Sequence, residues 1–507
     1  MGPSKDKEEA VPTGSAVPAS LPEPANSSLA PPGTRLPCHR VTVSPGHLRR
    51  LLETAGLLLC VLLILRVLGS EPYSVPTGSM APTLLGNHQA VNCPRCGYPV
   101  LVGAPNGEGR RHGLPSCPNC GCTELELDHV PVSRGDQLLV NKNVFDFRRP
   151  RRWEVAVFRC PADPGKEFVK RIIGLPGESV LLWDGDVYID HELARKSLAE
   201  FKRLRIPVFD NNHQPSPDGW APRWEAQPAG AAVALEGTAL RLSGSARPDD
   251  YLWLRYRHWS LDEHREVPVR DAYSYNGGEP AAASAVHDFM LECDVELLGG
   301  DGWVAFGITD GHDEFIAEVP VGAVKEGSRL RGRQPGEEDK EETVYRTAPD
   351  FGLRSGKTYR VEFAFVDRRA TLAIDGRCPF APVDRPAVER RDAVVRPVQI
   401  GTRGVEVRVR NVRLFRDVHY TEAGRHGVRR PLPLGAGEYF VLGDNSPNSD
   451  DSRFWSDAAG QPLPVRAEDF VGKPFLVHLP SRAVEWHWLG RQWQHQTIDW
   501  QRMRWLR

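Results

Sequence analysis

Two short stretches of this 507-residue chain decide its fold: PTGSMAPTL at residues 76–84 and VKRIIGLPGE at residues 169–178. The first stretch presents Ser79 and the second presents Lys170. A serine hydroxyl becomes a nucleophile when a neighbouring base removes its proton, and a lysine can be that base if its surroundings keep it neutral. Ser-Lys pairs are a known variant of the serine-protease arrangement. The two stretches therefore predict nucleophilic catalysis by a serine and a lysine.

A third stretch, GDNSPNSDDSR at residues 443–453, completes the pattern. In sequence and in order, the three stretches resemble the most diagnostic boxes of the type I signal peptidases, and we call them the first, second and third boxes. The resemblance covers roughly residues 50–90, 130–195 and 430–480. It implies a membrane-bound serine endopeptidase with a mainly β catalytic core, which removes signal peptides from secreted preproteins and needs no cofactor for catalysis.

The resemblance also implies a role for several single residues. Ser79 would be the nucleophile and Lys170 the general base. The donors to the oxyanion would be the backbone N–H of Ser79 and the hydroxyl of Thr77, which stands where serine is commoner in the family. A free lysine has a pKa near 10.4, so a base that acts near neutrality needs a pKa about three units lower. Burial among apolar side chains is the usual means of lowering it.

The third box would support this pair. By the same resemblance, Ser449 would hold the lysine, Asp451 and Arg453 would form an ion pair, and Asp444 would brace the loop. One departure concerns the strand predicted at 153–158, which begins Trp-Glu where the family usually has Gly-Asp. That strand lines the substrate groove in the family, so we expect the pockets for small signal-peptide residues to be reshaped.

The segment 92–128 carries two cysteine pairs with metal-site spacing. The pairs are Cys93-x-x-Cys96 and Cys117-x-x-Cys120, and each is followed at once by glycine. Four thiolates at this spacing suit tetrahedral zinc, so we expect a structural zinc ribbon. Disulfides are the alternative, because the predicted topology puts these cysteines outside the cytoplasm.

The segment 201–425 alternates apolar and polar residues over a long series of short runs, which is typical of an antiparallel β-sandwich. It resembles concanavalin-like and laminin-G-like jelly rolls through its strand order. A glycan site is one interpretation, and a spacer or protein-docking role is another. Because loop closure costs rise slowly with length, we expect the boxes to pack as if this insertion were absent. In an alternative function, an anchored sandwich binds carbohydrate or protein while the peptidase core is a remnant.

The N-terminal part predicts a membrane anchor. Residues 51–68 are mostly apolar, and about eighteen residues suffice to span a bilayer if Arg66 reaches the interface. A buried core helix is the alternative. Arg49 and Arg50 precede the span, which favours a cytoplasmic N-terminus. We therefore expect a single-pass protein of the cytoplasmic (inner) membrane with its catalytic domain on the outer side.

The net charge and the C-terminal residues limit which partners we expect. The net charge of −2 gives no electrostatic case for a nucleic-acid partner. Trp beside Arg in the last residues suits a membrane–water interface, with packing against the catalytic domain as the alternative. The predicted organisation is a disordered tail (1–46), a transmembrane helix (47–69), the nucleophile segment (70–91), the zinc-ribbon-like insertion (92–128), the general-base segment (129–200), the β-sandwich insertion (201–425), the third-box segment (426–481) and a Trp/Arg-rich tail (482–507).

Overall fold

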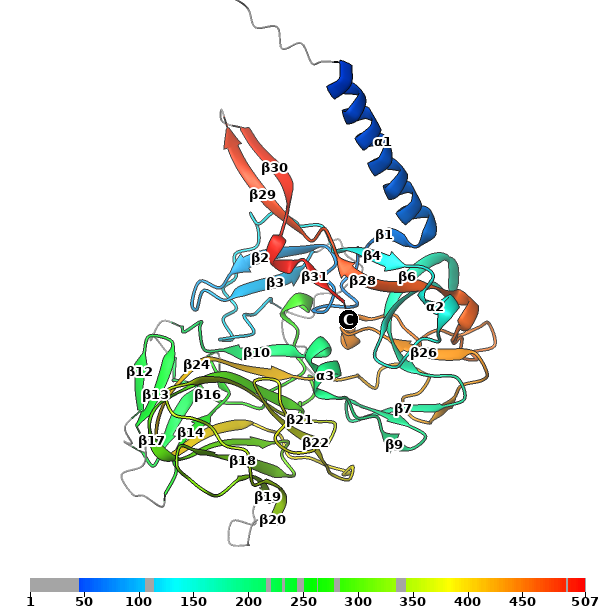
Figure 1. The fold of residues 1–507 in the computed structure, drawn as a ribbon. Coiled ribbons are helices and arrows are strands. Elements are labelled where there is room, and N and C mark those ends of the chain that lie inside the picture. Colours follow the sequence, from blue (N-terminus) through cyan, green and yellow to red (C-terminus); the bar gives the residue numbers. More distant parts are fainter. Residues whose placement is uncertain are drawn as a thin grey trace, which may run out of the picture. The chain divides into compact units, whose positions relative to one another are not determined.

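The computed structural model describes residues 45–104, 114–215, 220–229, 233–243, 250–261, 263–277, 283–333, 343–488 and 491–506. The predicted disordered tail lies outside these ranges except for its last two residues. The chain divides into two compact units, Met1–Leu62 and Leu63–Arg507, which are described separately. The fold is mainly β, as the sequence predicts (Figure 1).

The helix predicted near the N-terminus is present as α1, Pro45–Leu68. Its leucines between residues 51 and 63 are exposed by half or more. Among the residues that the structure describes, none of the helices is both long and apolar enough to cross a membrane.

One antiparallel sheet, which we call the catalytic sheet, carries the second box on a strand and the first and third boxes in loops that follow two of its strands. Its strands, in spatial order, are β1 (Ser70–Ser74), β4 (Gln137–Asn141), β28 (Phe470–Val477), β5 (Val155–Cys160), β6 (Asp163–Gly174), β26 (Glu438–Leu442) and β27 (Val465–Arg466), with β31 (Arg504–Trp505) beside β28. The strand predicted at 153–158 is present as β5, which begins two residues later. Alternation explains β4, where Leu138 and Val140 are fully buried and their neighbours are not.

A smaller sheet continues from the second box. It contains β25 (Leu432–Pro433), β7 (Ser179–Trp183), β8 (Asp186–Ile189) and β9 (Glu192–Leu193). Strands β7 and β8 form a hairpin that turns at Asp184 and Gly185. Both turn residues have positive φ, 50° and 84°, which Asp and Gly tolerate better than other residues.

The insertion forms the second large sheet. Its main path runs β11 (Trp224–Gln227), β14 (Leu252–Tyr256), β24 (Val398–Arg416), β17 (Phe289–Thr309), β18 (Glu314–Val321), β19 (Ser328–Arg333) and β20 (Thr343–Ala348), and the strands beside it are β10 (Ile206–Asp210), β12 (Val233–Glu236), β13 (Ala239–Ser243), β21 (Thr358–Val366), β22 (Arg369–Ile374) and β23 (Val383–Asp384).

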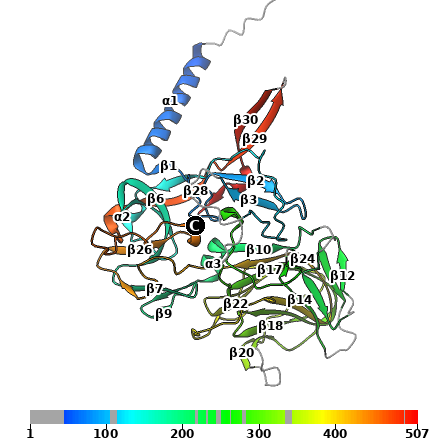
Figure 2. The ribbon, with the colours of Figure 1, turned by 180° about the vertical axis from the view of Figure 1, so that it is seen from behind.

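Two long strands organise the sandwich, as the views from front and back show (Figures 1 and 2). β17 pairs with β24 along nearly its whole length. Its first half also pairs with β21 and its second half with β18, with register shifts between Leu297 and Trp303. Such irregularities bend a strand, so the sheet can curl. It encloses one apolar core with members on all these strands.

The other elements are short. They are the hairpins β2 (His88–Asn92) with β3 (Pro99–Gly103), β15 (Trp259–Ser260) with β16 (Arg265–Glu266), and β29 (Ser481–Trp488) with β30 (Arg491–Ile498), the helices α2 (Val144–Phe147) and α3 (Leu198–Leu204), and the 3-10 turns η1 (Ser274–Asn276), η2 (Ser446–Asn448), η3 (Ala467–Asp469) and η4 (Trp500–Arg502).

The predicted Trp/Arg-rich tail is folded and in part packs on the catalytic sheet. β31 pairs with β28, and Trp505 stacks on Phe475 with ring centroids 5.9 Å apart. Trp486, Trp493 and Trp500 are each more than half exposed. The last residues therefore pack on the catalytic sheet in part, while these three tryptophans and Trp505 itself, which is 66% exposed, stay mostly open to their surroundings.

Candidate active site

Ser79 and Lys170 come together although 91 residues separate them. Ser79 lies in the loop that follows β1, and Lys170 lies on β6 opposite the fully buried Ala156 of β5. Lys170 Nζ is 2.7 Å from Ser79 Oγ and 3.1 Å from Ser449 Oγ. One lysine thus contacts a serine from the first box and a serine from the third.

The surroundings of Lys170 favour its neutral form. The side chain is only 3% exposed, and burial lowers its pKa to about 8 although Asp451 and Asp450 act to raise it. A buried ammonium loses its hydration, so desolvation outweighs the two carboxylates. The direction of the shift is the one that a general base near neutrality requires.

The third box is held by buried ion pairs. Arg453 Nε and Nη2 each lie 2.8 Å from an oxygen of Asp451, and both side chains are fully buried. Burial alone would raise the pKa of Asp451, but the charge and hydrogen bonds of Arg453 hold it below its usual range. The expected Asp451–Arg453 pair is therefore present, and it keeps Asp451 ionised behind Lys170.

Asp444 has a partner that the sequence does not indicate. Arg171, which follows Lys170 on β6, donates from Nε (2.7 Å) and Nη2 (2.5 Å) to the two oxygens of Asp444. Such a bidentate contact fixes orientation as well as charge. It joins the second box to the third, so Asp444 braces the loop through Arg171. Arg171 belongs to the second box, but its pairing with Asp444 arises because β6 and β26 are neighbours in the sheet.

Two glycines allow the boxes to approach one another. A Cβ at Gly443 would lie 2.3 Å from Ser449 Oγ and 2.4 Å from the carbonyl oxygen of Ser79. A Cβ at Gly86 would lie 2.3 Å from the carbonyl carbon of Thr77. Side chains at these positions would push apart the segments that carry Ser79, Thr77 and Ser449.

Trp153 occupies a position that suits glycine. Its φ is 66°, in the left-handed region, which is rare for a bulky residue. Its ring is nearly buried, and Lys196 Nζ lies 4.5 Å from the ring centroid. Trp153, which stands where the family usually has glycine, therefore packs in an apolar cluster that includes Val418 and Tyr420 of the insertion. Glu154 binds Arg148 and Lys473.

The four predicted cysteine ligands form one buried cluster. Their sulfur atoms all lie within 4.8 Å of one another, and the Cys93–Cys120 and Cys96–Cys117 sulfur pairs are 3.6 Å apart. None of the four forms a disulfide. The glycines after each pair, Gly97 and Gly121, have φ of 71° and 83°. Four convergent thiols in two glycine-ended turns have the chemistry of a zinc site.

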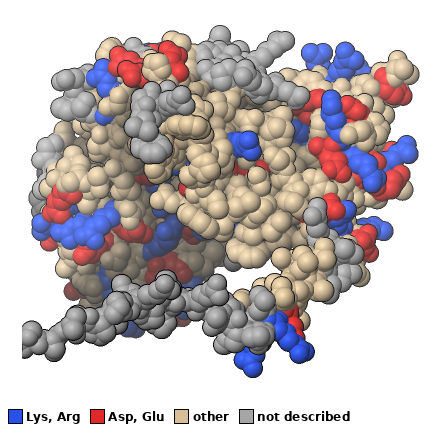
Figure 3. Space-filling model, turned by 90° about the horizontal axis from the view of Figure 1, so that it is seen from above, with Lys and Arg blue, Asp and Glu red and all other residues tan. Residues whose placement is uncertain are grey.

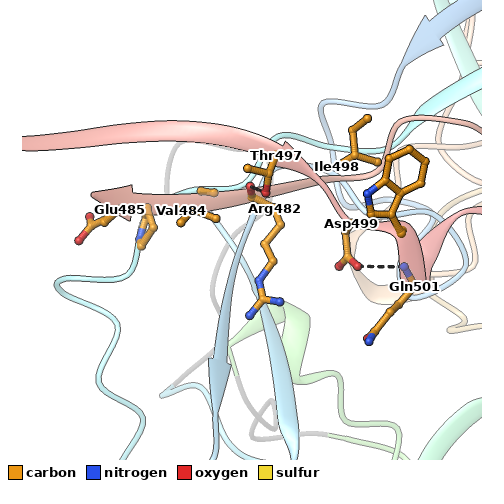
Figure 4. A pocket seen from close by; sticks show the side chains of 10 residues that line it. Arg482, Val484, Glu485, Thr497, Ile498, Asp499 and Gln501 are labelled. Atoms are coloured by element: carbon orange, nitrogen blue, oxygen red, sulfur yellow. Dashed lines mark hydrogen bonds between the residues drawn. The ribbon is translucent and has the colours of Figure 1, made fainter. Parts of the chain in front are cut away.

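A surface pocket lies away from Ser79, Lys170 and the cysteine cluster. Residues of β29, β30 and η4 line a pocket of about 730 Å³ that contains none of the predicted site residues (Figure 4). Asp499 accepts a hydrogen bond from the Gln501 backbone there. Viewed from above, the described side chains of both charge signs lie mostly in groups toward the edges, around a broad area without Lys, Arg, Asp or Glu (Figure 3).

Comparison with protein families identifies the class. A model of signal peptidases, peptidase S26, matches residues 130–220 and 367–479. These segments contain Lys170 and the third box, whereas Ser79 lies before them. Over these two segments the chain matches the signal peptidase family, so the predicted resemblance is confirmed. The second segment begins inside the predicted insertion 201–425.

Relatives of known name agree with this assignment. Signal peptidase I of Rickettsia typhi is 30% identical over 147 residues, which are 28% of this chain and 44% of the relative. Signal peptidase I of Rickettsia akari is 28% identical over 152 residues, 29% of this chain and 46% of the relative. The chain thus matches less than half the length of these relatives.

Solved structures similar to part of the chain are β-sandwiches. The carbohydrate-binding module CBM66 from Bacillus subtilis covers 38% of the chain at 15% identity, with 94% of that module matched and a TM-score of 0.23. The Emp46p carbohydrate recognition domain covers 38% at 12% identity, with 88% of that domain matched and a TM-score of 0.25. Likeness at this level carries no conclusion about what the sandwich binds.

Proposed function

We propose that the protein is a membrane-bound serine endopeptidase that cleaves signal peptides from secreted preproteins with Ser79 as nucleophile and Lys170 as general base. The observation that carries this proposal is the 2.7 Å distance between Lys170 Nζ and Ser79 Oγ, with Lys170 buried. The match of the segments that contain Lys170 and the third box to the signal peptidase family supports it.

In the proposed mechanism, neutral Lys170 takes the proton of Ser79 as its Oγ attacks the scissile carbonyl. The negative charge that develops on the carbonyl oxygen is stabilised by the Ser79 N–H and the Thr77 hydroxyl. The Lys170 ammonium then gives its proton to the leaving amine, and an acyl group remains on Ser79. Lys170 next takes a proton from water, which attacks the ester and restores Ser79. Ser449, 3.1 Å from Nζ, keeps the amine aimed at Ser79.

The proposal includes an anchor and a structural metal. Residues 47–69 would hold the protein in the cytoplasmic membrane as a single pass, with the catalytic unit on the outer side; the apolar sequence of this segment is the support. Cys93, Cys96, Cys117 and Cys120 would bind one zinc ion.

The test uses the full chain in lipid vesicles with a secreted precursor. Ser79→Ala and Lys170→Ala should each abolish release of the signal peptide, whereas Ser79→Cys should keep some activity because a thiol is also a nucleophile. Ser74→Ala and Lys142→Ala, which change an exposed serine and an exposed lysine, are the matched controls. Cleavage by either active-site alanine variant at the wild-type rate would favour the alternative, an anchored binding protein with a remnant core.

A further inference from the structure

A short turn of the insertion reaches the nucleophile loop. This turn, residues 273–277, contains η1 and is buried at Tyr275 and Asn276. The Tyr273 hydroxyl donates to the carbonyl oxygen of Asp444 (3.1 Å), and the Tyr275 hydroxyl donates to that of Asn87 (3.0 Å). The turn therefore contacts the third box and the segment that follows the first box.

Asn276 forms a reciprocal pair with Asn445 of the third box. Asn276 Nδ2 donates to Asn445 Oδ1 and Asn445 Nδ2 donates to Asn276 Oδ1, each at 2.7 Å. The exposed fraction is 4% for Asn276 and 0% for Asn445. The pair fixes the two amides relative to each other, and the Gly78 carbonyl oxygen, which can only accept, requires that the Nδ2 end of Asn445 face the nucleophile loop.

The fixed amide of Asn445 holds the peptide before the nucleophile. Asn445 Nδ2 donates to the Gly78 carbonyl oxygen (2.9 Å), and Asn445 N donates to that of Ser79 (3.1 Å). The Gly78 oxygen also accepts from Ala81 N at 3.0 Å. The Tyr275 ring closes the other side, because a Cβ at Gly78 would lie 2.1 Å from its Cε1.

The Gly78 carbonyl and the Ser79 N–H belong to one peptide unit. That unit is planar and trans, so the carbonyl and the N–H point in opposite directions. Whatever fixes the Gly78 oxygen therefore also fixes the direction of the Ser79 N–H. In the proposed mechanism this N–H is a donor to the oxyanion, and such donors act by being aimed in advance.

We propose that Asn276 of the insertion is a positioning residue for catalysis: through Asn445 it orients the Gly78–Ser79 peptide so that the Ser79 N–H faces the developing oxyanion. This inference rests on the proposed function of Ser79. It makes the sandwich insertion a contributor to the active site.

A double-mutant cycle on the full chain tests the inference. We expect Asn276→Ala to lower kcat for a peptide substrate by about 10- to 100-fold, somewhat less than loss of a whole oxyanion donor, and to change KM by less than about twofold. Asn445→Ala should have a similar effect, and the double variant should be no slower than the slower single variant, because both act through one contact. Affinity for a peptide aldehyde, which forms a tetrahedral adduct with serine, should fall in parallel with kcat/KM.

Asn212→Ala is the matched control, since Asn212 forms an exposed Asn–Asn contact elsewhere in the insertion. A kcat of Asn276→Ala within about twofold of wild type, or effects that multiply in the double variant, would overturn the inference. If Asn276→Ala does not fold, the isosteric Asn276→Asp replaces it, and a wild-type kcat for that variant has the same meaning. Ser79→Ala, measured alongside, separates the two proposals: if it cleaves normally, the proposed function fails as well.

Discussion

At the scale of single residues, the proposed chemistry depends on how the pKa of Lys170 is lowered. Its amine is in contact with Ser79 and Ser449, and the carboxylate of Asp451 behind it is already paired with Arg453. Because that charge is compensated, it opposes the effect of burial only in part, and the pKa of Lys170 is lowered to about 8.

The first prediction is a pH profile. Only neutral Lys170 can accept the proton of Ser79, so cleavage should be slow where the lysine is protonated, rise about tenfold per pH unit below about 8, and level off above it. An unshifted lysine would place this rise more than two units higher, near 10.4. Measuring kcat/KM for a peptide between pH 6 and about pH 10 decides between a lowered and an unshifted pKa of Lys170.

The second prediction concerns the charge that opposes this shift. Asp450 is exposed and raises the pKa of Lys170, so Asp450→Asn should move the midpoint of the profile to lower pH. Glu468→Gln, an exposed carboxylate that is not among the charges acting on Lys170, is the control and should leave the midpoint in place. A midpoint that moves upward in Asp450→Asn would contradict the assignment of the titration to Lys170.

At the scale of elements, the third box is a loop held by one arginine. Arg453 binds Asp451, donates to the carbonyl and hydroxyl oxygens of Thr421 at 2.9 and 2.7 Å, and donates to both oxygens of Ser446. These contacts connect the segment between β24 and β25, which contains Thr421, with the loop between β26 and β27. The loop therefore keeps Ser449 in place although the short 3-10 turn η2 is the regular structure next to it.

The third prediction follows from this network. Arg453→Ala should lower the free energy of unfolding by about 3–5 kcal/mol, since it leaves a buried carboxylate without its partner. Arg466→Ala removes an exposed arginine from the same segment and should change it by less than about 0.5 kcal/mol. Denaturant titration of both variants is the measurement, and equal stabilities would contradict the importance of the pair.

The fourth prediction concerns the cysteine hairpins as a unit. Purified protein should contain about one zinc per chain, because four convergent thiols in glycine-ended turns suit the metal. Cys93→Ser should lose the zinc, and Cys378→Ser, which changes an exposed cysteine of the insertion, should keep it. Metal analysis with a thiol count decides, and metal-free protein with these cysteines oxidised in pairs would refute the site.

At the scale of the whole molecule, the insertion and the catalytic sheet share buried contacts. Besides the turn at 273–277, Lys196 of the general-base segment lies 2.7 Å from Asp367 and 2.9 Å from Asp417, both in the insertion. All three side chains are at least nine-tenths buried. The expectation that the boxes pack as if the insertion were absent is therefore wrong, because insertion residues complete the surroundings of Trp153, Asp444 and Asn445.

The fifth prediction reverses that expectation. Replacing 201–425 by a short Gly-Ser linker should reduce cleavage of even a simple peptide by more than about tenfold, because the linker lacks Asn276 and uncovers Lys196 and Trp153. Thermal unfolding of the shortened chain shows whether it folds, with the intact chain as reference. A folded, shortened protein that cleaves the peptide within about tenfold of the intact rate would show that the sandwich is dispensable.

The sequence by itself determined the features that depend on local pattern. Alternation predicts the strands, the glycines after the cysteine pairs predict the metal-site turns, and the three boxes indicate Ser79, Lys170 and the residues that support them. Each of these signals is contained in a few neighbouring residues, so it survives without knowledge of the fold.

Only the tertiary structure decided which distant residues meet. Asn276 stands in no motif, and Arg171 is paired with Asp444 only because β6 and β26 are neighbours. The left-handed backbone of Trp153 and its packing against residues of the insertion likewise cannot be predicted from the sequence. Such contacts join residues far apart in sequence, and their partners depend on strand order and burial, which no short stretch of sequence encodes.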